Sequence, residues 1–526
     1  GTGPQREPAM NVESFFAHHR IEDNPFAAEE ARLDPVFDRL MGEGPLHPDF
    51  PKVLGQVDKP STAIVFGEKG SGKTAIRLML ARRNEQHNRD QPTGDKQTQP
   101  GRRVLLVSYD ELNPFLDNLL RSTSQDVDKA LSKLRLADHQ DAILSLAVER
   151  VVDAVLGEAG PDDEPLAFPA DLDRRLKALP RPVRANFAVL AALYDQPRTG
   201  LIEDRFDRLR RKLHLRWRLP LKLTRDVGGV AALTAVVFAL LWSYVDQPAW
   251  WVMLVAVVAA IKAVASLGYW AARSWSLWRL SRSAAADTPT IGRTSGELRR
   301  LLSELRASDL KRQPMPTRRH GVEPASEPRY QLTRRFLDAL APLGYVGLTV
   351  LVDRVDEPTS VQGRSERMRA IVWPMLDNKF LKQDRVGLKL LLPLELRHML
   401  MRESPDFFQE ARLDKQNLVD RLTWSGATLY DLCSRRLSAC RAGDAEPIKL
   451  VDLFEDDVTR ETLIDALDQM HQPRDAFKLM YQVIQEHCRL TTEEQASYRI
   501  ARLTLESVRR TQSQRVQELY RGLSPA

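Results

Sequence analysis

Two long apolar segments in the middle of the sequence constrain the fold most strongly. Residues 227–245 contain no charged side chain, and residues 249–272 contain one, Lys262. A helix of nineteen residues is about 28 Å long, which matches the hydrocarbon core of a bilayer. The polar sequence D-Q-P at 246–248 separates the segments and predicts a tight turn. The pattern predicts a two-helix hairpin that spans a membrane; a buried hairpin in a soluble core is the alternative.

The residues that flank the two segments predict the orientation of this hairpin. Aromatic side chains mark both ends of it, as at bilayer interfaces: Trp242, Tyr244, Trp250 and Trp251 near the turn, and Tyr269, Trp270, Trp275 and Trp278 at the opposite end. The turn has no Lys or Arg, whereas both outer flanks are basic, so the positive-inside rule predicts an exported turn and cytoplasmic flanks. Lys262 either extends to the cytoplasmic interface or faces a partner helix.

The positive charge of the chain is concentrated in one block. The net charge is +6, and residues 205–225 contain nine Lys and Arg side chains and one acid, so the remainder is slightly acidic. The block directly precedes the first apolar segment, where we expect it to contact anionic lipid head groups. Nucleic acid is therefore not an expected partner. The three cysteines match no zinc-binding spacing, and the sequence has no metalloprotease motif or nucleophile signature.

A glycine-rich loop lies near the N-terminus. The sequence G-E-K-G-S-G-K-T at 67–74 matches G-x-x-x-x-G-K-[ST], follows the apolar stretch 64–66 and precedes a segment with helical periodicity. In such loops, backbone amides and the helix N-terminus bind phosphate. The pattern predicts ATP binding, with Lys73 at the β- and γ-phosphates and the Thr74 hydroxyl as a ligand of Mg²⁺. The residues predicted to contact nucleotide are Gly67, Glu68, Lys69, Gly70, Ser71, Gly72, Lys73 and Thr74.

An apolar strand that ends at an acid complements this loop. Six of the eight residues at 345–352 are apolar and Asp353 follows them, so Asp353 is the predicted carboxylate ligand of Mg²⁺. Asp356 and Glu357 are candidates for polarising the attacking water, or they belong to an ordinary solvated loop. Further strands are predicted at 103–108 and 386–393, which gives an α/β fold with a mainly parallel sheet.

The loop G-E-K-G-S-G-K-T, the strand sequence L-V-D-R-V-D-E and the hairpin between them resemble the KAP and STAND-like P-loop ATPases of bacteria. KAP ATPases carry membrane helices between the loop and the acidic strand, which is the order found here. The sequence H-Q-P-R-D-A-F from His471 resembles their lid motif, which implies that Pro473 contacts nucleotide and Arg474 senses its phosphates. A plain helix start at Pro473 fits equally well. Arg354 departs from the family, which often has a second acid directly after the metal-binding aspartate.

The resemblance implies a function for the whole chain. It implies a homo-oligomeric, membrane-anchored ATPase with the cofactors ATP and Mg²⁺, acting as a nucleotide-dependent switch in anti-phage defence or membrane-linked signalling through a protein effector. It also implies the bacterial plasma membrane as the location, with the ATPase domain and both termini in the cytoplasm. Arg354 keeps a second function open, that of a membrane scaffold that holds nucleotide and hydrolyses it slowly or not at all.

The expected architecture is a P-loop NTPase sheet with a helical insertion that contains the transmembrane hairpin, and a helical C-terminal lid. The expected parts are residues 1–110 as the first half of the NTPase core, 111–225 as the helical insertion, 226–280 as the transmembrane hairpin, 281–330 as a linker with an amphipathic helix at 297–311, 331–403 as the second half of the core, and 404–526 as the lid. The polar residues 84–103 are expected to form a loop.

Overall fold

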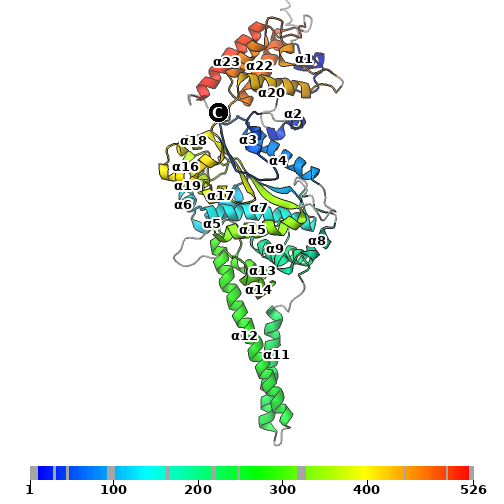
Figure 1. The fold of residues 1–526 in the computed structure, drawn as a ribbon, viewed down its shortest axis with the longest axis vertical. Helices are drawn as coiled ribbons and strands as arrows, with labels where there is room; N and C mark the ends of the chain where they lie inside the picture. Colours follow the sequence, from blue (N-terminus) through cyan, green and yellow to red (C-terminus); the bar gives the residue numbers. More distant parts are fainter. Residues whose placement is uncertain are drawn as a thin grey trace, which may run out of the picture. The chain divides into compact units, whose positions relative to one another are not determined.

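The computed structural model divides the chain into two compact units, which we describe separately (Figure 1). The loop unit comprises residues 1–86, 351–356 and 387–526, and the hairpin unit comprises residues 87–350 and 357–386. The structure describes residues 10–27, 31–42, 47–91, 101–160, 166, 168–169, 171–198, 200–215, 221–245, 249–316, 327–443, 445–492 and 496–520.

Five strands form a sheet in the order β2-β3-β4-β1-β5. Their bounds are β1 Ala63–Gly67, β2 Arg103–Tyr109, β3 Tyr345–Val352, β4 Val386–Pro393 and β5 Asn417–Val419. β1 runs parallel to β4 and β5, with Val65 opposite Leu391 on one side and Val419 on the other. Every residue of β1 and β4 is buried, which explains why both sequences are mostly apolar. The predicted strands and the α/β class are confirmed, but β5 escapes prediction because three residues are too few to show a period.

The loop unit combines helices from both ends of the chain. Its helices are α1 (Val12–His18), η1 (Ala31–Leu33), α2 (Pro35–Leu40), α3 (Phe50–Leu54), most of α4 (Lys73–Asp90), α18 (Leu394–Leu400), α19 (Pro405–Ala411), η4 (Leu413–Lys415), α20 (Gly426–Ala439), η5 (Leu450–Leu453), α21 (Arg460–Asp468), α22 (Pro473–Leu490) and α23 (Arg502–Tyr520). Phe15 of α1, Leu437 of α20 and Leu479 of α22 are fully buried in one apolar cluster. Arg436 in α20 also pairs with Asp34 before α2, at 2.6 Å. Residues 10–27 and 31–40 therefore fold together with the C-terminal helices.

The hairpin unit is helical apart from its parts of the sheet. Its helices are α5 (Asn113–Thr123), α6 (Val127–Leu131), α7 (Leu136–Leu156), α8 (Leu172–Ala178), α9 (Arg181–Tyr194), α10 (Ile202–Lys212), α11 (Leu221–Tyr244), α12 (Trp250–Asp287), α13 (Ser295–Ser303), α14 (Ala307–Lys311), α15 (Glu327–Leu340), η2 (Ala341–Leu343), α16 (Ser365–Val372), η3 (Trp373–Met375) and α17 (Asn378–Leu381). The helical insertion predicted at 111–225 corresponds to α5 through α10 and the first residues of α11.

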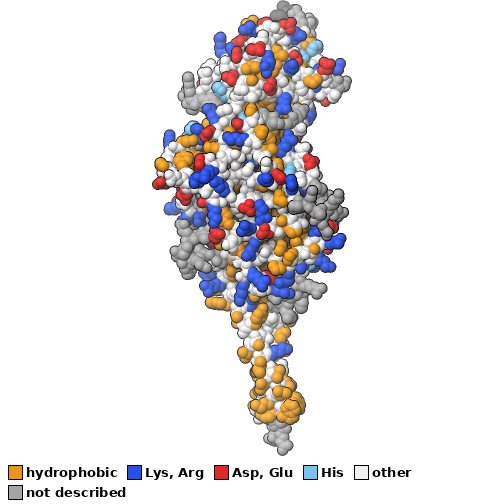
Figure 2. Space-filling view, in the orientation of Figure 1, with side chains coloured by type: hydrophobic (Ala, Val, Ile, Leu, Met, Phe, Trp, Pro, Cys, Tyr) orange, Lys and Arg blue, Asp and Glu red, His pale blue; other side chains and the backbone are white. Residues whose placement is uncertain are grey.

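Helices α11 and α12 form the apolar hairpin, and both are long and apolar enough to cross a membrane. They pack closely at Gly228, where an added Cβ would lie 2.8 Å from Leu267 Cγ. Away from this contact their large apolar side chains are exposed: Leu233 is 66% exposed, Ile261 64% and Val264 74%. Figure 2 shows the continuous apolar surface of the hairpin. Such a surface indicates an apolar partner rather than water. The turn expected at 246–248 lies outside the described residues.

Three expected boundaries are wrong. Residues 281–287 are not a linker but the last turns of α12, because Ser281, Ala284 and Asp287 are buried. The helix expected at 297–311 is broken into α13 and α14. Residues 84–90 belong to α4 and not to a loop, and Asn88 ties this end to β2 through two 2.9 Å hydrogen bonds with the Val104 backbone. The rest of that expected loop at 92–100 and the linker residues 317–326 lie outside the described residues.

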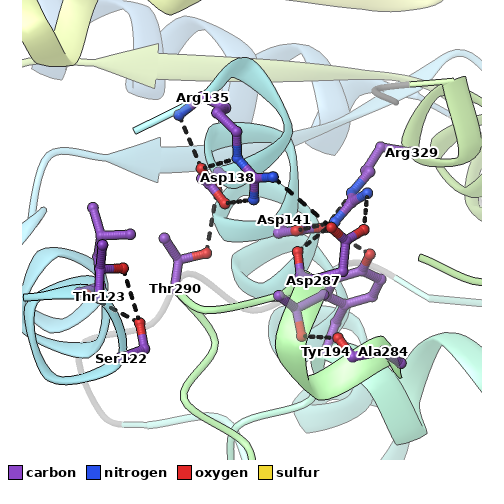
Figure 3. Close-up of polar contacts among 12 residues, drawn as sticks. Ser122, Thr123, Arg135, Asp138, Asp141, Tyr194, Ala284, Asp287, Thr290 and Arg329 are labelled. Carbon is purple, nitrogen blue, oxygen red and sulfur yellow. Dashed lines mark hydrogen bonds and ion pairs between the residues drawn. The ribbon is translucent and has the colours of Figure 1, made fainter. Parts of the chain in front are cut away.

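A buried ion cluster fixes the end of α12 to three other helices (Figure 3). Arg329 of α15 is fully buried and donates to both carboxylate oxygens of Asp141 in α7, at 2.8 and 3.0 Å. It also donates to Asp287, the last residue of α12, at 2.8 Å. The Tyr194 hydroxyl of α9 donates to Asp141 at 2.8 Å. Since each of these buried charges has partners with good geometry, the cluster holds the base of the hairpin in one position.

Candidate functional site

The glycine-rich loop joins the carboxyl end of β1 to the first turn of α4. Gly70 and Gly72 have φ angles of +92° and +93°, which glycine adopts without strain. The amide and the hydroxyl of Ser71 both donate to the Glu68 carbonyl, at 3.2 and 2.8 Å, and close a tight turn. A Cβ at position 67 would lie 2.4 Å from Ser71 Oγ. The loop conformation therefore depends on glycine at all three positions.

Lys73, at the start of α4, folds back onto the loop. Its ammonium group donates to the carbonyls of Gly67 and Glu68, at 2.8 and 2.9 Å. Burial lowers the pKa of Lys73, and the negative charges of Asp353, Asp356, Glu395 and Glu68 oppose that shift. Acids that follow β3 and β4 thus raise the pKa of the same lysine. The Lys73 amino group can exchange these carbonyls for phosphate oxygens.

Asp353 lies directly after β3 and is 1% exposed. The Thr74 hydroxyl donates to its Oδ2 at 3.4 Å, so the two predicted metal ligands are neighbours. Hard oxygen donors of this kind suit Mg²⁺, which takes one or two protein oxygens and completes its shell with water and phosphate. Among the described residues, no three His, Cys, Asp or Glu side chains come together as an all-protein metal site.

Arg77 contacts the same carboxylate and was not predicted as a site residue. Its Nε lies 3.4 Å from Asp353 Oδ2, and both side chains are buried. Arg77 follows Thr74 by three residues on α4, so the two lie on one helix face. That spacing was the available sequence signal. The pair places a fixed positive charge beside the candidate metal ligand.

The segment after Asp353 separates the two candidate catalytic acids. Arg354 has a φ of +61°, a left-handed conformation that is strained for a residue with a side chain. Val355 is fully buried. Asp356 is half-buried and adds its negative charge to the surroundings of Lys73. Glu357 is exposed and belongs to the hairpin unit. Asp356 is thus the acid that the structure associates with the loop.

The start of α22 lies against the loop. The Gln472 side-chain amide donates to Glu68 Oε2. A Cβ at Gly70 would lie 2.8 Å from Gln472 Oε1 and 3.2 Å from Arg474 Cβ. Pro473 is buried in the first turn of the helix. The Nε of Arg474 is buried and has no hydrogen-bond partner among the described residues. A buried guanidinium donor without a partner beside a glycine-rich loop is a candidate contact for an anion.

The segment after β5 also contacts the loop, which the sequence did not indicate. The Trp424 indole donates to the Ser71 carbonyl at 2.8 Å, and Arg421 donates to Glu68 Oε1 at 2.5 Å. The ring of His47 packs edge-on against Trp424, with centroids 4.7 Å apart. Glu68 and Ser71 are therefore held by residues more than 350 positions away in the sequence. Such contacts have no local pattern, so only the fold could reveal them.

Comparison with protein-family models, with curated proteins and with solved structures found no match to this chain.

Proposed function

We propose that this chain is a membrane-anchored P-loop ATPase that binds ATP with Mg²⁺ and acts as a nucleotide-dependent switch. The observation that carries the proposal is the arrangement around the loop. Lys73 folds onto a glycine-rich loop, Thr74 and Asp353 offer neighbouring oxygens, and the buried Arg474 Nε beside the loop has no partner among the described residues. All three features supply what a bound nucleoside triphosphate with its cation requires.

Each residue has a defined role in this proposal. The loop amides and Lys73 bind the phosphates, Thr74 and Asp353 hold Mg²⁺, and Arg474 contacts the terminal phosphates from α22. Pro473 positions Arg474 at the start of the helix. When bound, Mg²⁺ would neutralise charge on the phosphate oxygens. Asp356 orients the attacking water; Glu357 is the second candidate for that role.

The hairpin places this ATPase at a membrane in our proposal. α11 and α12 cross the plasma membrane of a bacterium, with the loop unit and both termini in the cytoplasm. The family resemblance adds a homo-oligomer and a protein effector, in anti-phage defence or membrane-linked signalling. Nucleotide occupancy would change the contacts that Gln472, Arg474 and Arg421 make with the loop, which is how a γ-phosphate can bias a lid.

ATP turnover and ATP binding by the purified full chain test the proposal. Lys73→Ala should abolish turnover and weaken ATP binding by at least tenfold, because a charge-assisted contact to phosphate is lost. Lys59→Ala, an exposed lysine of the same unit, is the matched control and should behave as the wild type. Equal ATP binding by wild type and Lys73→Ala would refute a nucleotide site at this loop.

Deletion of residues 227–272 tests the anchor separately. The shortened chain should move to the soluble fraction and keep its ATP affinity, because no residue of the loop unit is removed. Loss of ATP binding together with persistent sedimentation would show that the hairpin is part of the folded core and not an anchor.

A nucleotide-binding scaffold that hardly hydrolyses ATP is the second candidate, and the Arg77–Asp353 pair favours it. A guanidinium at 3.4 Å already partly neutralises the predicted metal ligand. If hydrolysis is limited in this way, Arg77→Met should lower the Mg²⁺ concentration needed for half-maximal ATP binding and raise the turnover rate. A variant with unchanged Mg²⁺ dependence and turnover would assign slow hydrolysis, if measured, to another residue such as Arg354.

A further inference from the structure

One face of α12, beyond the apolar part of the hairpin, combines exposed aromatic and basic side chains. Trp275, Trp278, Arg279 and Arg282 have the spacing i, i+3, i+4 and i+7, which places them on the same side of the helix. All four are exposed; Trp275 is 65% exposed and Trp278 39%. We call them the α12 patch.

The opposite face of the same turns is packed, so the α12 patch cannot turn inward. Arg273, Leu277, Ser281 and Ala284 are buried there, at 9% exposure or less. Arg273 donates to the carbonyl of Leu305 between α13 and α14, at 2.8 Å. Asp287 then anchors the helix end to Arg329. The rotation of α12 is fixed, and the α12 patch points away from the hairpin unit.

The side chains of the α12 patch are preorganised for a surface. The Trp275 and Trp278 rings stack with centroids 5.1 Å apart, and the Arg282 guanidinium lies 5.4 Å from the centroid of the Trp278 ring. Neither Arg279 nor Arg282 forms an ion pair with an acid among the described residues. The only acid in α12 is Asp287, which Arg329 already neutralises. Two positive charges and two aromatic rings are therefore available to a partner.

The position of the α12 patch along the helix identifies that partner. Counting from Trp250 at the hairpin tip, a hydrocarbon core of about 30 Å ends near Tyr269 and Trp270. The patch follows at roughly 8 to 18 Å beyond that edge, so it begins at the outer limit of the head groups, which extend about 5–8 Å from the core. Helical side chains lean toward the N-terminus of their helix, which for α12 is toward the bilayer. Figure 2 shows Lys and Arg side chains gathered around this base of the hairpin.

The basic block at 205–225 is less suited to this role than its composition indicates. Arg205 is buried among Asp153, Asp195 and Glu158, and Arg208 also pairs with Glu158. Arg210 and Arg211 both pair with Asp207, at 2.7 Å. Arg225 pairs with Asp226 at 3.0 Å, so at least five of the nine basic residues are neutralised within the protein, whereas the two arginines of the α12 patch pair with no acid among the described residues.

We propose that the α12 patch binds the head groups of anionic phospholipids on the cytoplasmic surface of the membrane. The proposal rests on the proposed insertion of the hairpin. The rings of Trp275 and Trp278 extend from the helix toward the head-group region, where aromatic rings are favoured. Arg279 and Arg282 contact the lipid phosphates and select acidic over zwitterionic lipids. The patch sets the depth of the hairpin and the lipid composition around it.

Fluorescence quenching in vesicles tests the proposal with the full chain. The vesicles contain phosphatidylcholine, with bromine on the acyl chains of either phosphatidylcholine or phosphatidylglycerol, and tryptophan quenching gives the relative affinity for the two lipids. The wild type should prefer phosphatidylglycerol. Arg279→Gln with Arg282→Gln should reduce the preference by about fivefold for each arginine.

Two control variants and the wild type separate the outcomes. Arg279→Lys with Arg282→Lys keeps the charge and should keep the preference, and Arg208→Gln with Arg211→Gln should also keep it. If neither brominated lipid quenches the wild type, the hairpin does not insert and the proposed membrane anchor fails. Two results would refute lipid binding by the α12 patch while leaving the proposed membrane anchor intact. One is a wild type that both brominated lipids quench equally; the other is a preference for phosphatidylglycerol that only the Arg208 and Arg211 variant loses.

Discussion

The buried charges around Arg329 and those around the glycine-rich loop differ in their contacts. In the hairpin unit, Arg329 makes short bonds to Asp141 and Asp287, and Tyr194 completes the cluster. Around the loop, the Arg77 Nε and the Thr74 hydroxyl lie 3.4 Å from Asp353 Oδ2, and the Arg474 Nε has no partner among the described residues. Several short bonds fix one arrangement of the Arg329 cluster, whereas the buried Arg474 Nε is a donor available to something that binds. The comparison separates a structural cluster from a candidate site within one chain.

Removing Arg329 should give the largest effect on stability. Arg329→Met leaves Asp141 and Asp287 buried without their cation, so we expect the free energy of unfolding to fall by about 3–5 kcal/mol. ATP affinity of the folded fraction should not change. Denaturant titration in detergent measures the first effect and ATP binding the second. Arg300→Met, which removes a surface pair with Glu203, is the control and should change stability by less than about 1 kcal/mol. A small effect of Arg329→Met would remove the contrast between the units.

Glu149 is a largely buried acid of the hairpin unit, and its partner Arg198 does not offset the effect of burial on its pKa. Burial, followed by the charge of Asp153, raises its pKa to about 7, against a usual value of 4.5. The folded protein keeps the proton that the unfolded chain releases, so the free energy of unfolding should fall as pH rises from about 4.5 to about 7. Glu149→Gln removes this fall.

The Glu149→Gln variant should therefore be more stable than the wild type by on the order of 3 kcal/mol at pH 8, and by little at pH 4. Thermal unfolding at both pH values measures the difference. An advantage that is the same at both values would attribute it to packing and not to the proton.

Arg474 tests whether a buried donor in the loop unit contributes to ATP binding. Arg474→Met removes a buried donor without a partner, so the nucleotide-free protein should keep its stability or gain slightly. ATP affinity should fall by about 10- to 100-fold, the value of a hydrogen bond to a charged group. Calorimetric titration with ATP, with the exposed Arg510→Met as control, measures this difference. Loss of stability with unchanged affinity would make Arg474 a structural residue like Arg329.

Arg354 should give the smallest effect. Its φ of +61° is strained, so Arg354→Gly should be more stable than Arg354→Ala by about 1 kcal/mol, since both lose the side chain and only glycine relaxes the backbone. Denaturant midpoints of the two variants give the value. Equal stability of the two variants would show that the backbone at this position is not strained.

The sequence by itself determined the elements with strong local patterns. Mostly apolar runs predicted the strands at 345–352 and 386–393 because a parallel strand is buried on both faces. The glycines of the loop were recognisable because positive φ angles restrict the residue type. The apolar hairpin followed from length and absence of charge. Each of these signals is carried by residues that are neighbours in the chain.

Only the tertiary structure decided which distant residues meet. It extended α12 to Asp287, because Arg329 from another helix neutralises that carboxylate. It placed Arg421, Trp424 and Gln472 against the loop, and it paired Arg77 with Asp353. It also showed that acids within the hairpin unit neutralise much of the basic block at 205–225, whereas Arg279 and Arg282 pair with no acid among the described residues. Pairing between charges depends on distances in space, which a one-dimensional pattern does not contain.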